Sequence, residues 1–139
     1  PTTLALVRAL TLRSAGFRYC VDEKQVEVTG RARAADVVRG GDGAEFLNRP
    51  GGALPLVRLR ALLGQPPAEE AHEEFDFVVA ATQVAVAVDE LGRRGEVLVR
   101  GLGRHAARWY GVSGAAELRD GTVALLLDLP RLLETHARS

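Results

Sequence analysis

The sequence predicts an all-β protein made of two similar halves, each of which has the elements of a small barrel. Apolar residues mostly alternate with polar ones, which is the period of half-buried strands. Helical spacing is confined to two short segments, and two pairs of segments match each other in the same order along the chain. We therefore expect each half to contain a hairpin, a further pair of strands and a short closing helix.

In the first half, alternating apolar residues occur at 4–12 and again at 17–21, separated by a short turn that contains Gly16. Two such runs around a turn predict a β-hairpin. Residues 59–63 have leucines at the spacing of one helical turn, and a glycine and then two prolines follow them. This pattern predicts a short helix with a defined end.

The second half has the same elements. Apolar residues alternate at 84–88 and again at 97–99. The runs at 115–118 and 123–127 flank an Asp-Gly pair, whose preference for positive φ favours a tight hairpin turn. Leucines at helical spacing in 129–133, with a proline in the first turn, predict the closing helix.

The matching segments define the expected domain organisation. Residues 51–63 match 121–133 at an offset of 70, and 17–23 match 84–90 at an offset of 67. The segment between the halves (QPPAEEAHEE) lacks an apolar rhythm and is typical of a loop. We therefore predict one barrel at 10–67, a connecting loop at 68–74, and a second barrel with the C-terminal helix at 75–139.

The composition excludes several classes of function. Basic and acidic side chains number 18 each, so the chain lacks the positive field that attracts nucleic acids and anionic membranes. No apolar run approaches the ~20 residues of a membrane span, and the N-terminus does not resemble a signal peptide. The single Cys20 can form no intrachain disulfide, so we expect a cytoplasmic protein without membrane insertion. Because the chain contains no methionine, we expect it to be a piece of a longer protein.

No motif points to a catalytic, cofactor-binding or metal site. Cys20 has no histidine nearby in sequence to activate it, so a structural thiol is favoured. The histidines His72, His105 and His136 lack metal-ligand spacing. Glu69 and its acidic neighbours are typical of a solvated loop. The short glycine clusters do not lie between a strand and a helix, as a phosphate-binding loop would.

A basic run and an aromatic pair leave alternatives open. Small barrels can bind single-stranded nucleic acid, but neutral net charge and 5% aromatic residues favour a solvated or protein-contacting face instead. The run consists of Arg93, Arg94, Arg100, Arg104 and Arg108. Next to it, Trp109 and Tyr110 are typical of either a protein contact or a core, with core packing slightly favoured.

Four stretches carry a resemblance to a known family. Residues 111–128 read GVSGAAELRDGTVALLLD, 54–59 read LPLVRL, 91–103 read LGRRGEVLVRGLG and 3–10 read TLALVRAL. They are similar to motifs of the CheW-like domain at the C-terminal end of CheA-type chemotaxis histidine kinases, and the resemblance covers essentially the whole chain. Residues 1–9 resemble the junction with the preceding kinase domain. Residues 48–52 retain only the Asn of the NLRG-like motif of free-standing CheW adaptors, which remain the alternative.

The resemblance implies two five-stranded SH3-like barrels related by a pseudo-twofold axis, with no chemistry of their own and no cofactor. It implies three partners: a CheW-type adaptor, the cytoplasmic tip of a chemoreceptor, and the kinase domain of the same chain. It also implies cytoplasmic receptor arrays as the location. Because the sequence departs from the family motif at Ala116, Glu117 and Arg119, interface residues cannot be transferred directly. Our candidates for partner binding lie on the barrel edges and between the barrels: Val97, Val99, Leu102, Trp109, Tyr110, Leu54 and Leu56.

Overall fold

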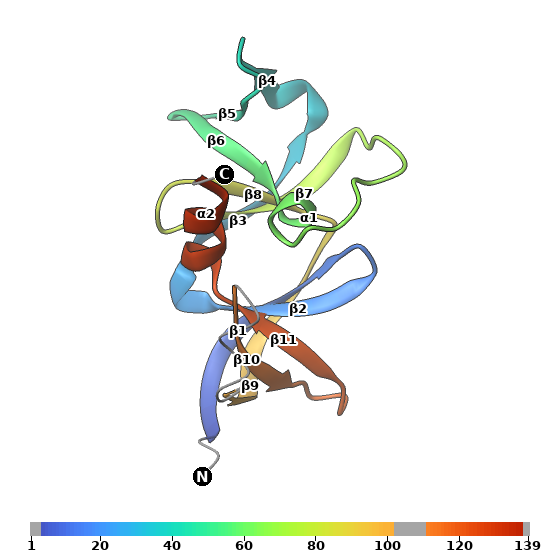
Figure 1. Ribbon diagram of the computed structural model, residues 1–139, viewed down its shortest axis with the longest axis vertical. Helices are drawn as coiled ribbons and strands as arrows, with labels where there is room; N and C mark the ends of the chain where they lie inside the picture. Colours follow the sequence, from blue (N-terminus) through green and yellow to red (C-terminus); the bar gives the residue numbers. More distant parts are fainter. Residues whose placement is uncertain (1–3, 102–110, 138–139) are drawn as a thin grey trace.

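A computed structural model describes residues 4–101 and 111–137 (Figure 1). Its strands are β1 (Leu4–Ser14), β2 (Phe17–Asp22), β3 (Val26–Arg33), β4 (Val37–Arg39), β5 (Glu45–Arg49), β6 (Gly52–Arg58), β7 (Glu74–Ala80), β8 (Ala85–Val88), β9 (Glu90–Arg100), β10 (Val112–Glu117) and β11 (Val123–Leu127). Its helices are α1 (Leu59–Leu62) and α2 (Leu129–Ala137), with 3-10 turns η1 (Glu23–Gln25) and η2 (Ala34–Asp36). The predicted mostly-β class with two barrel-like sheets is confirmed.

The strands form two sheets, which lie one above the other in Figure 1. Barrel one is a closed barrel in the order β1-β2-β11-β10-β9, and barrel two is a six-stranded sheet in the order β3-β7-β8-β6-β5-β4. The two predicted hairpins are present, since Leu10 pairs with Val21 and Ala116 with Ala124. The two short helices also form where the leucine spacing predicts them.

The sheets do not follow the predicted boundaries at 10–67 and 75–139. Barrel one combines the first hairpin of the chain with its last three strands, and barrel two takes all the strands between them. Residues 4–9, expected in a junction, are the first part of β1. The two halves matched in the sequence have the same order of strands. The first hairpin of each half, however, pairs with the strands of the other half: β1–β2 with β9–β11, and β7–β8 with β3–β6. Residues 68–73 do lie in the loop between α1 and β7, and residue 74 begins β7.

The exchange of hairpins produces the same parallel contact in both sheets. β11 runs parallel to β2 in barrel one, and β6 runs parallel to β8 in barrel two. In each case the parallel strand leads directly into a short helix, α2 after β11 and α1 after β6. The repeat seen in the sequence is therefore a repeat of strand connectivity.

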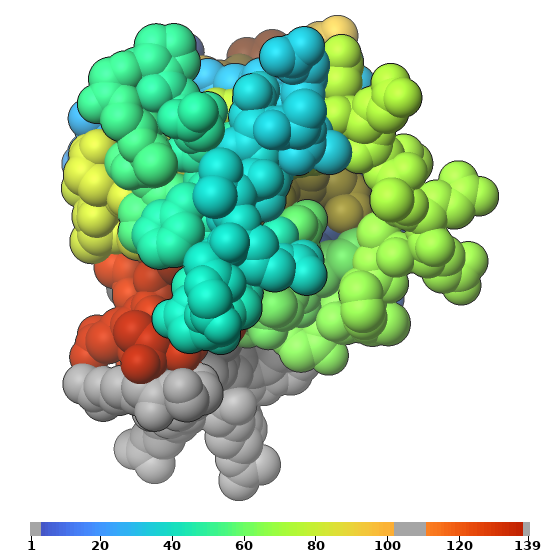
Figure 2. All heavy atoms as spheres, turned by 90° about the horizontal axis from the view of Figure 1, so that it is seen from above, coloured from blue at the N-terminus to red at the C-terminus, as the bar shows by residue number. Residues whose placement is uncertain are grey.

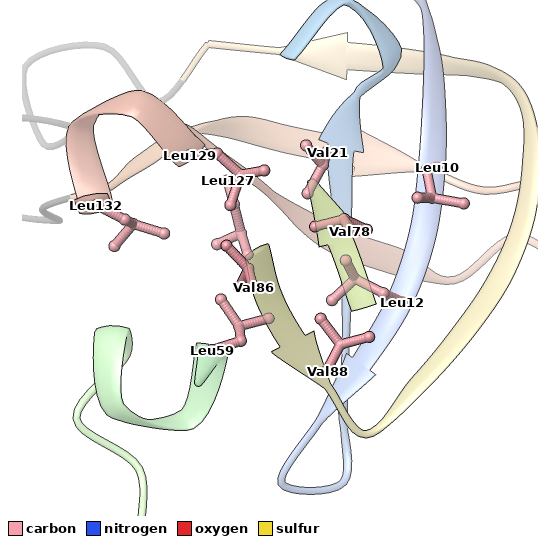
Figure 3. Packing of buried hydrophobic residues seen from close by; sticks show 10 residues of the cluster. All are labelled: Leu10, Leu12, Val21, Leu59, Val78, Val86, Val88, Leu127, Leu129 and Leu132. Carbon is pink, nitrogen blue, oxygen red and sulfur yellow. The ribbon is translucent and has the colours of Figure 1, made fainter. Parts of the chain in front are cut away.

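Three hydrophobic clusters hold the molecule together. The cluster inside barrel one combines small side chains such as Ala9 with larger ones such as Leu126, and the cluster inside barrel two includes the ring of Phe77. A third cluster lies between the barrels and draws on strands of both and on both helices (Figure 3). Its buried members are Leu10, Leu12, Val21, Leu59, Val78, Val86, Val88, Leu127, Leu129 and Leu132. Because this core is shared and the hairpins are exchanged, neither barrel is complete without the other.

Candidate functional site

The structure places the sequence-predicted partner residues mainly inside the barrels. Val97 and Val99 are only 6% and 8% exposed in the interior of barrel one, and Leu56 is 4% exposed in the interior of barrel two. Leu54 is half-buried against the same interior. Strand alternation identifies two faces but does not say which one faces the core, and here the chosen residues face inward. Leu102, Trp109 and Tyr110 lie outside the described residues.

Barrel two carries an exposed apolar row, which we call the barrel-two face. It consists of Val38, Phe46 and Pro55 on the adjacent strands β4, β5 and β6, with Phe46 paired directly to both neighbours. Val38 is 54% exposed and Phe46 36% exposed. Seen from this end of the molecule, the chain from β3 to β5 lies across the surface in cyan and teal (Figure 2). Adjacent apolar side chains that remain exposed mark a protein contact more often than scattered ones do.

The equivalent row in barrel one is not apolar at its outer end. Leu125 follows Pro55 by the repeat offset of 70, and across the strands it meets Ala115 and then Arg100. Arg100 is exposed where barrel two has Val38. The apolar character of the barrel-two face is therefore not a general property of this kind of barrel.

Barrel one has a different apolar surface, which we call the barrel-one face. Tyr19 pairs with Leu125 across the parallel strands β2 and β11, so Phe17 and Val123 occupy the same face two residues earlier. Phe17 is 64% exposed and Val123 66% exposed. Further along the same strands, Val21 and Leu127 enter the shared core. The barrel-one face is thus the exposed continuation of the core between the barrels.

A polar junction fixes the barrels relative to each other next to this face. Ser14 Oγ donates to Gln65 Oε1 at 2.7 Å, and Gln65 Nε2 donates to Tyr19 Oη at 2.9 Å. Asp89 accepts the backbone N–H of Ala15 at 2.7 Å and pairs with the guanidinium of Arg60 at 2.7 Å. These contacts join the β1–β2 turn, the end of α1 and the crossover from β8 to β9.

Burial disfavours ionisation at this junction, but hydrogen bonds outweigh that effect for Asp89. Burial alone would raise the pKa of Asp89, whereas hydrogen bonds from Arg60 and the Ala15 N–H hold it below its usual value. Burial also raises the pKa of the Tyr19 phenol, and its hydrogen bond with Gln65 acts in the opposite direction. The carboxylate of Asp89 is therefore charged and paired at neutral pH.

Cys20 is placed where its reactivity as a nucleophile is suppressed, and His105 lies outside the described residues. Cys20 is fully buried, and burial raises the pKa of its thiol to about 11 with only partial compensation by Arg18. A thiol protonated at neutral pH is a poor nucleophile. Within residues 4–101 and 111–137 no group of three His, Cys, Asp or Glu side chains could hold a metal ion. No helix in that part of the chain is long and apolar enough to cross a membrane.

The apolar faces escaped the sequence reasoning because exposure depends on neighbouring strands. Val38 lies within residues 29–43, the segment that matches the family motifs poorly, and Phe46 lies just beyond it. The one available signal was the glycine-rich turn between them, which contains Gly40, Gly41 and Gly43 and predicts a hairpin. A hairpin alone does not reveal which of its faces is left uncovered.

Comparison with known proteins identifies the family. The CheW-like domain model matches residues 8–137. The chain is 32% identical over 136 residues to the chemotaxis protein CheA of Halobacterium salinarum, covering 95% of this chain and 20% of that protein. It is 29% identical over 138 residues to CheA of Treponema pallidum, covering 96% of this chain and 17% of the relative. The chain thus spans about a fifth of the length of these curated relatives.

A solved structure shows the same fold. The scaffolding protein CheW of Thermoanaerobacter tengcongensis superposes with a TM-score of 0.68 at 12% identity, over 88% of this chain and 89% of that one. At this identity the likeness concerns the fold alone. The CheW-like family model spans nearly all of the chain, and the paired barrels have the fold of a CheW protein. The chain belongs to the CheW-like domain family.

Proposed function

We propose that the chain is the non-catalytic regulatory domain of a CheA-type histidine kinase. In this role it binds a CheW-type adaptor and the tip of a chemoreceptor, and it transmits the receptor state to the kinase domain of the same protein. The observation that carries the proposal is the pair of exposed apolar faces on a CheW-like fold whose curated relatives are CheA proteins. Location in a cytoplasmic receptor array follows from the same proposal.

The two faces suit different partners. The barrel-two face lies on a three-strand surface, which suits packing against the barrel of an adaptor. The barrel-one face continues the apolar core between the barrels and borders the polar junction. A surface of this kind, apolar beside a few fixed polar groups, suits the side of a receptor helix. We therefore assign the adaptor to the barrel-two face and the receptor to the barrel-one face.

Calorimetric titration with a CheW-type adaptor tests the first assignment. The variant Phe46→Ser removes the central side chain of the barrel-two face, and we expect the Kd to rise at least tenfold, about 1.4 kcal/mol. Val28→Ser is a matched control, because Val28 is 38% exposed against 36% for Phe46 but lies on β3. Equal affinity for the wild type and Phe46→Ser would contradict the assignment. No binding by the wild type, alone or within a full kinase, would contradict the proposed function itself.

A free-standing CheW-type adaptor is the second candidate. It is favoured by the length of the solved CheW scaffolding protein, 89% of which is covered by this chain. The coding sequence around the chain discriminates between the candidates. An upstream ATP-binding domain in the same reading frame supports the kinase, whereas a start codon directly before Pro1 supports the adaptor.

A further inference from the structure

The open end of barrel one forms a hollow that the docking faces do not use. Its volume is about 540 Å³, within the range of roughly 300–1,000 Å³ typical of ligand pockets. The turn between β1 and β2 and the turn between β10 and β11 lie on the same side of the molecule in Figure 1, and residues next to both line the hollow. We call this hollow the barrel-one mouth.

The floor of the barrel-one mouth is apolar. Ala9, Val97 and Leu118 line it, and all three are buried members of the barrel-one core. Gly95 also lines it, and a Cβ at this position would meet no atom within 4 Å. The hollow therefore reaches the barrel interior because β9 has no side chain at Gly95.

The rim of the barrel-one mouth is rich in arginine. Five arginines line the hollow against three acidic side chains, although the whole chain is neutral. The arginines are Arg13, Arg18, Arg93, Arg94 and Arg119, and the acids are Glu90, Glu96 and Asp120. Arg18 is held by Asp120 at 2.9 Å and Arg94 by Glu23 at 3.1 Å. The other three arginines have no ion-pair partner in the described part of the chain.

An arginine pair at the rim is only partly compensated within the chain. Arg13 and Arg18 lie directly opposite each other on the paired strands β1 and β2. Like charges at such positions destabilise a sheet. Here Asp120 pairs with Arg18. Arg13 also lies opposite Glu90 on β9, but no ion pair joins Arg13 to Glu90 among the described residues. Guanidinium groups bind carboxylates through two parallel hydrogen bonds, which makes a carboxylate the natural counter-charge.

Barrel two packs an arginine over an aromatic ring. There the ring of Phe77 is part of the core, and the Arg49 guanidinium lies over it at 5.2 Å from its centroid. Among the described residues the interior cluster of barrel one contains no aromatic side chain, and five arginines line the hollow beside it. An apolar group that enters the hollow would pack on this interior cluster.

We propose that the barrel-one mouth binds an organic anion. The apolar body of this anion packs on Ala9, Val97 and Leu118. Its carboxylate meets Arg13, Arg93 and Arg119. The same chemistry occurs at the carboxyl end of a polypeptide and in a small organic acid. The site is separate from the two docking faces, so it stands whether or not they bind their partners.

Amide chemical shifts of the 15N-labelled chain test the proposal. Titration with sodium hexanoate is expected to shift Gly92, Gly95 and Arg119 in a saturable manner. Hexan-1-ol lacks the charge and acetate lacks the apolar body, so each should bind at least tenfold more weakly. A tetrapeptide ending in leucine, compared with its C-terminal amide, distinguishes the sources: preference for the free carboxylate indicates a polypeptide end, and binding of hexanoate alone indicates a small acid.

Two variants locate the binding site. Gly95→Phe fills the floor without a clash at its Cβ and should abolish the shifts, whereas Gly41→Phe is a matched control with equally open space in barrel two. Arg119→Gln should weaken hexanoate at least threefold, and Arg33→Gln, an exposed arginine of barrel two, should not. Equal binding of hexanoate and hexanol, or undiminished binding by both Gly95→Phe and Arg119→Gln, would overturn the proposal.

Discussion

Barrel one is closed and barrel two is open, although the same strand connectivity builds both. In barrel one, β9 is an unbroken strand of 11 residues that pairs with β1 on one side and β10 on the other. In barrel two the corresponding path is split into β3 and β4 by the 3-10 turn η2. β3 pairs only with β7, and β4 pairs only with β5, among the described residues.

The first strand of the hairpin in each barrel also differs in length. β1 extends over 11 residues, and its first part, Leu4–Arg8, pairs with Glu96–Arg100. β7 has only 7 residues. The residue before it, Glu73, accepts a hydrogen bond from the backbone N–H of Ala34, and the loop that precedes Glu73 is not part of the sheet. The closed barrel therefore has the longer first strand of the two hairpins. The barrel left open is also the one that exposes the apolar row of Val38, Phe46 and Pro55.

The largest expected effect tests whether the two barrels are one folding unit. Leu127→Ala removes a fully buried side chain from the shared core and should lower the free energy of unfolding by about 3 kcal/mol. Because strands of both barrels pack on this core, urea unfolding followed by circular dichroism should remain a single transition. Hydrogen exchange should show protection falling in both barrels together. Loss of protection confined to barrel one would contradict the prediction that the two barrels unfold as one cooperative unit.

A glycine in each barrel sharpens the comparison of their packing. A Cβ at Gly114 would lie 2.7 Å from the backbone oxygen of Arg100, which is held by the closed barrel, so Gly114→Ala should cost about 2 kcal/mol. A Cβ at Gly30 would lie 2.9 Å from the ring of Phe77, a side chain that can shift, so Gly30→Ala should cost about 1 kcal/mol. Gly95→Ala meets no atom and serves as the control. The midpoints of urea unfolding report the stability of all three variants. A smaller loss of unfolding free energy for Gly114→Ala than for Gly30→Ala would contradict the expected difference in packing between the two barrels.

Strand edges should differ in the rate of amide hydrogen exchange. Val99 lies in a strand paired on both sides, opposite Ala5 and Ala116, whereas Val38 lies in an edge strand of three residues. We expect Val38 to exchange at least tenfold faster than Val99, which corresponds to about 1.4 kcal/mol of local opening free energy. Exchange measured by NMR in the same sample provides its own control. Equal protection would mean that β4 is covered as fully as β9.

The sequence predicted the parts of this fold that depend on local pattern. Alternation and turn residues located the hairpin that ends at Val21 and the one around Asp120, and leucine spacing located both helices. The exchange of hairpins was missed, because two similar halves can pair within themselves or with each other and the internal match is the same in both cases. The choice between these arrangements depends on the shared core, which brings residues as distant in sequence as Leu12 and Leu127 into one cluster.

The candidate site was less accessible to sequence reasoning for a related reason. Val97 and Leu56 have the alternation of half-buried strands, and both faces of these strands carry apolar residues. Which face is covered depends on the neighbouring sheet, so alternation alone does not distinguish the inward residues from the exposed Phe17, Val38 and Phe46. The arginine run in the sequence predicts a solvated or protein-contacting face. The contribution of Arg13 and Arg119 to the same hollow depends on strand pairing and not on spacing along the chain.

The smallest expected effect concerns the crossovers that connect the barrels. At the crossover from β8 to β9, Asp89 pairs with Arg60, whereas at the crossover from β2 to β3 the neutral Gln25 accepts the backbone N–H of Leu129 at 3.1 Å. Asp89→Asn should cost about 1 kcal/mol at pH 6, since the ion pair is partly exposed. Gln25→Ala should cost a comparable amount through loss of the contact at the start of α2.

Only the first of these two costs should depend on pH. The folded pKa of Asp89 lies below its unfolded value of about 3.9, so its contribution is present above that pH and is lost as the pH falls through the lower folded pKa. The difference in unfolding free energy between wild type and Asp89→Asn should therefore shrink in urea titrations carried from pH 6 toward pH 3. The difference for Gln25→Ala should stay constant, because neither of its hydrogen-bonded groups titrates. An Asp89→Asn difference as large at pH 3 as at pH 6 would show that packing, and not the charged pair with Arg60, joins the barrels at this crossover.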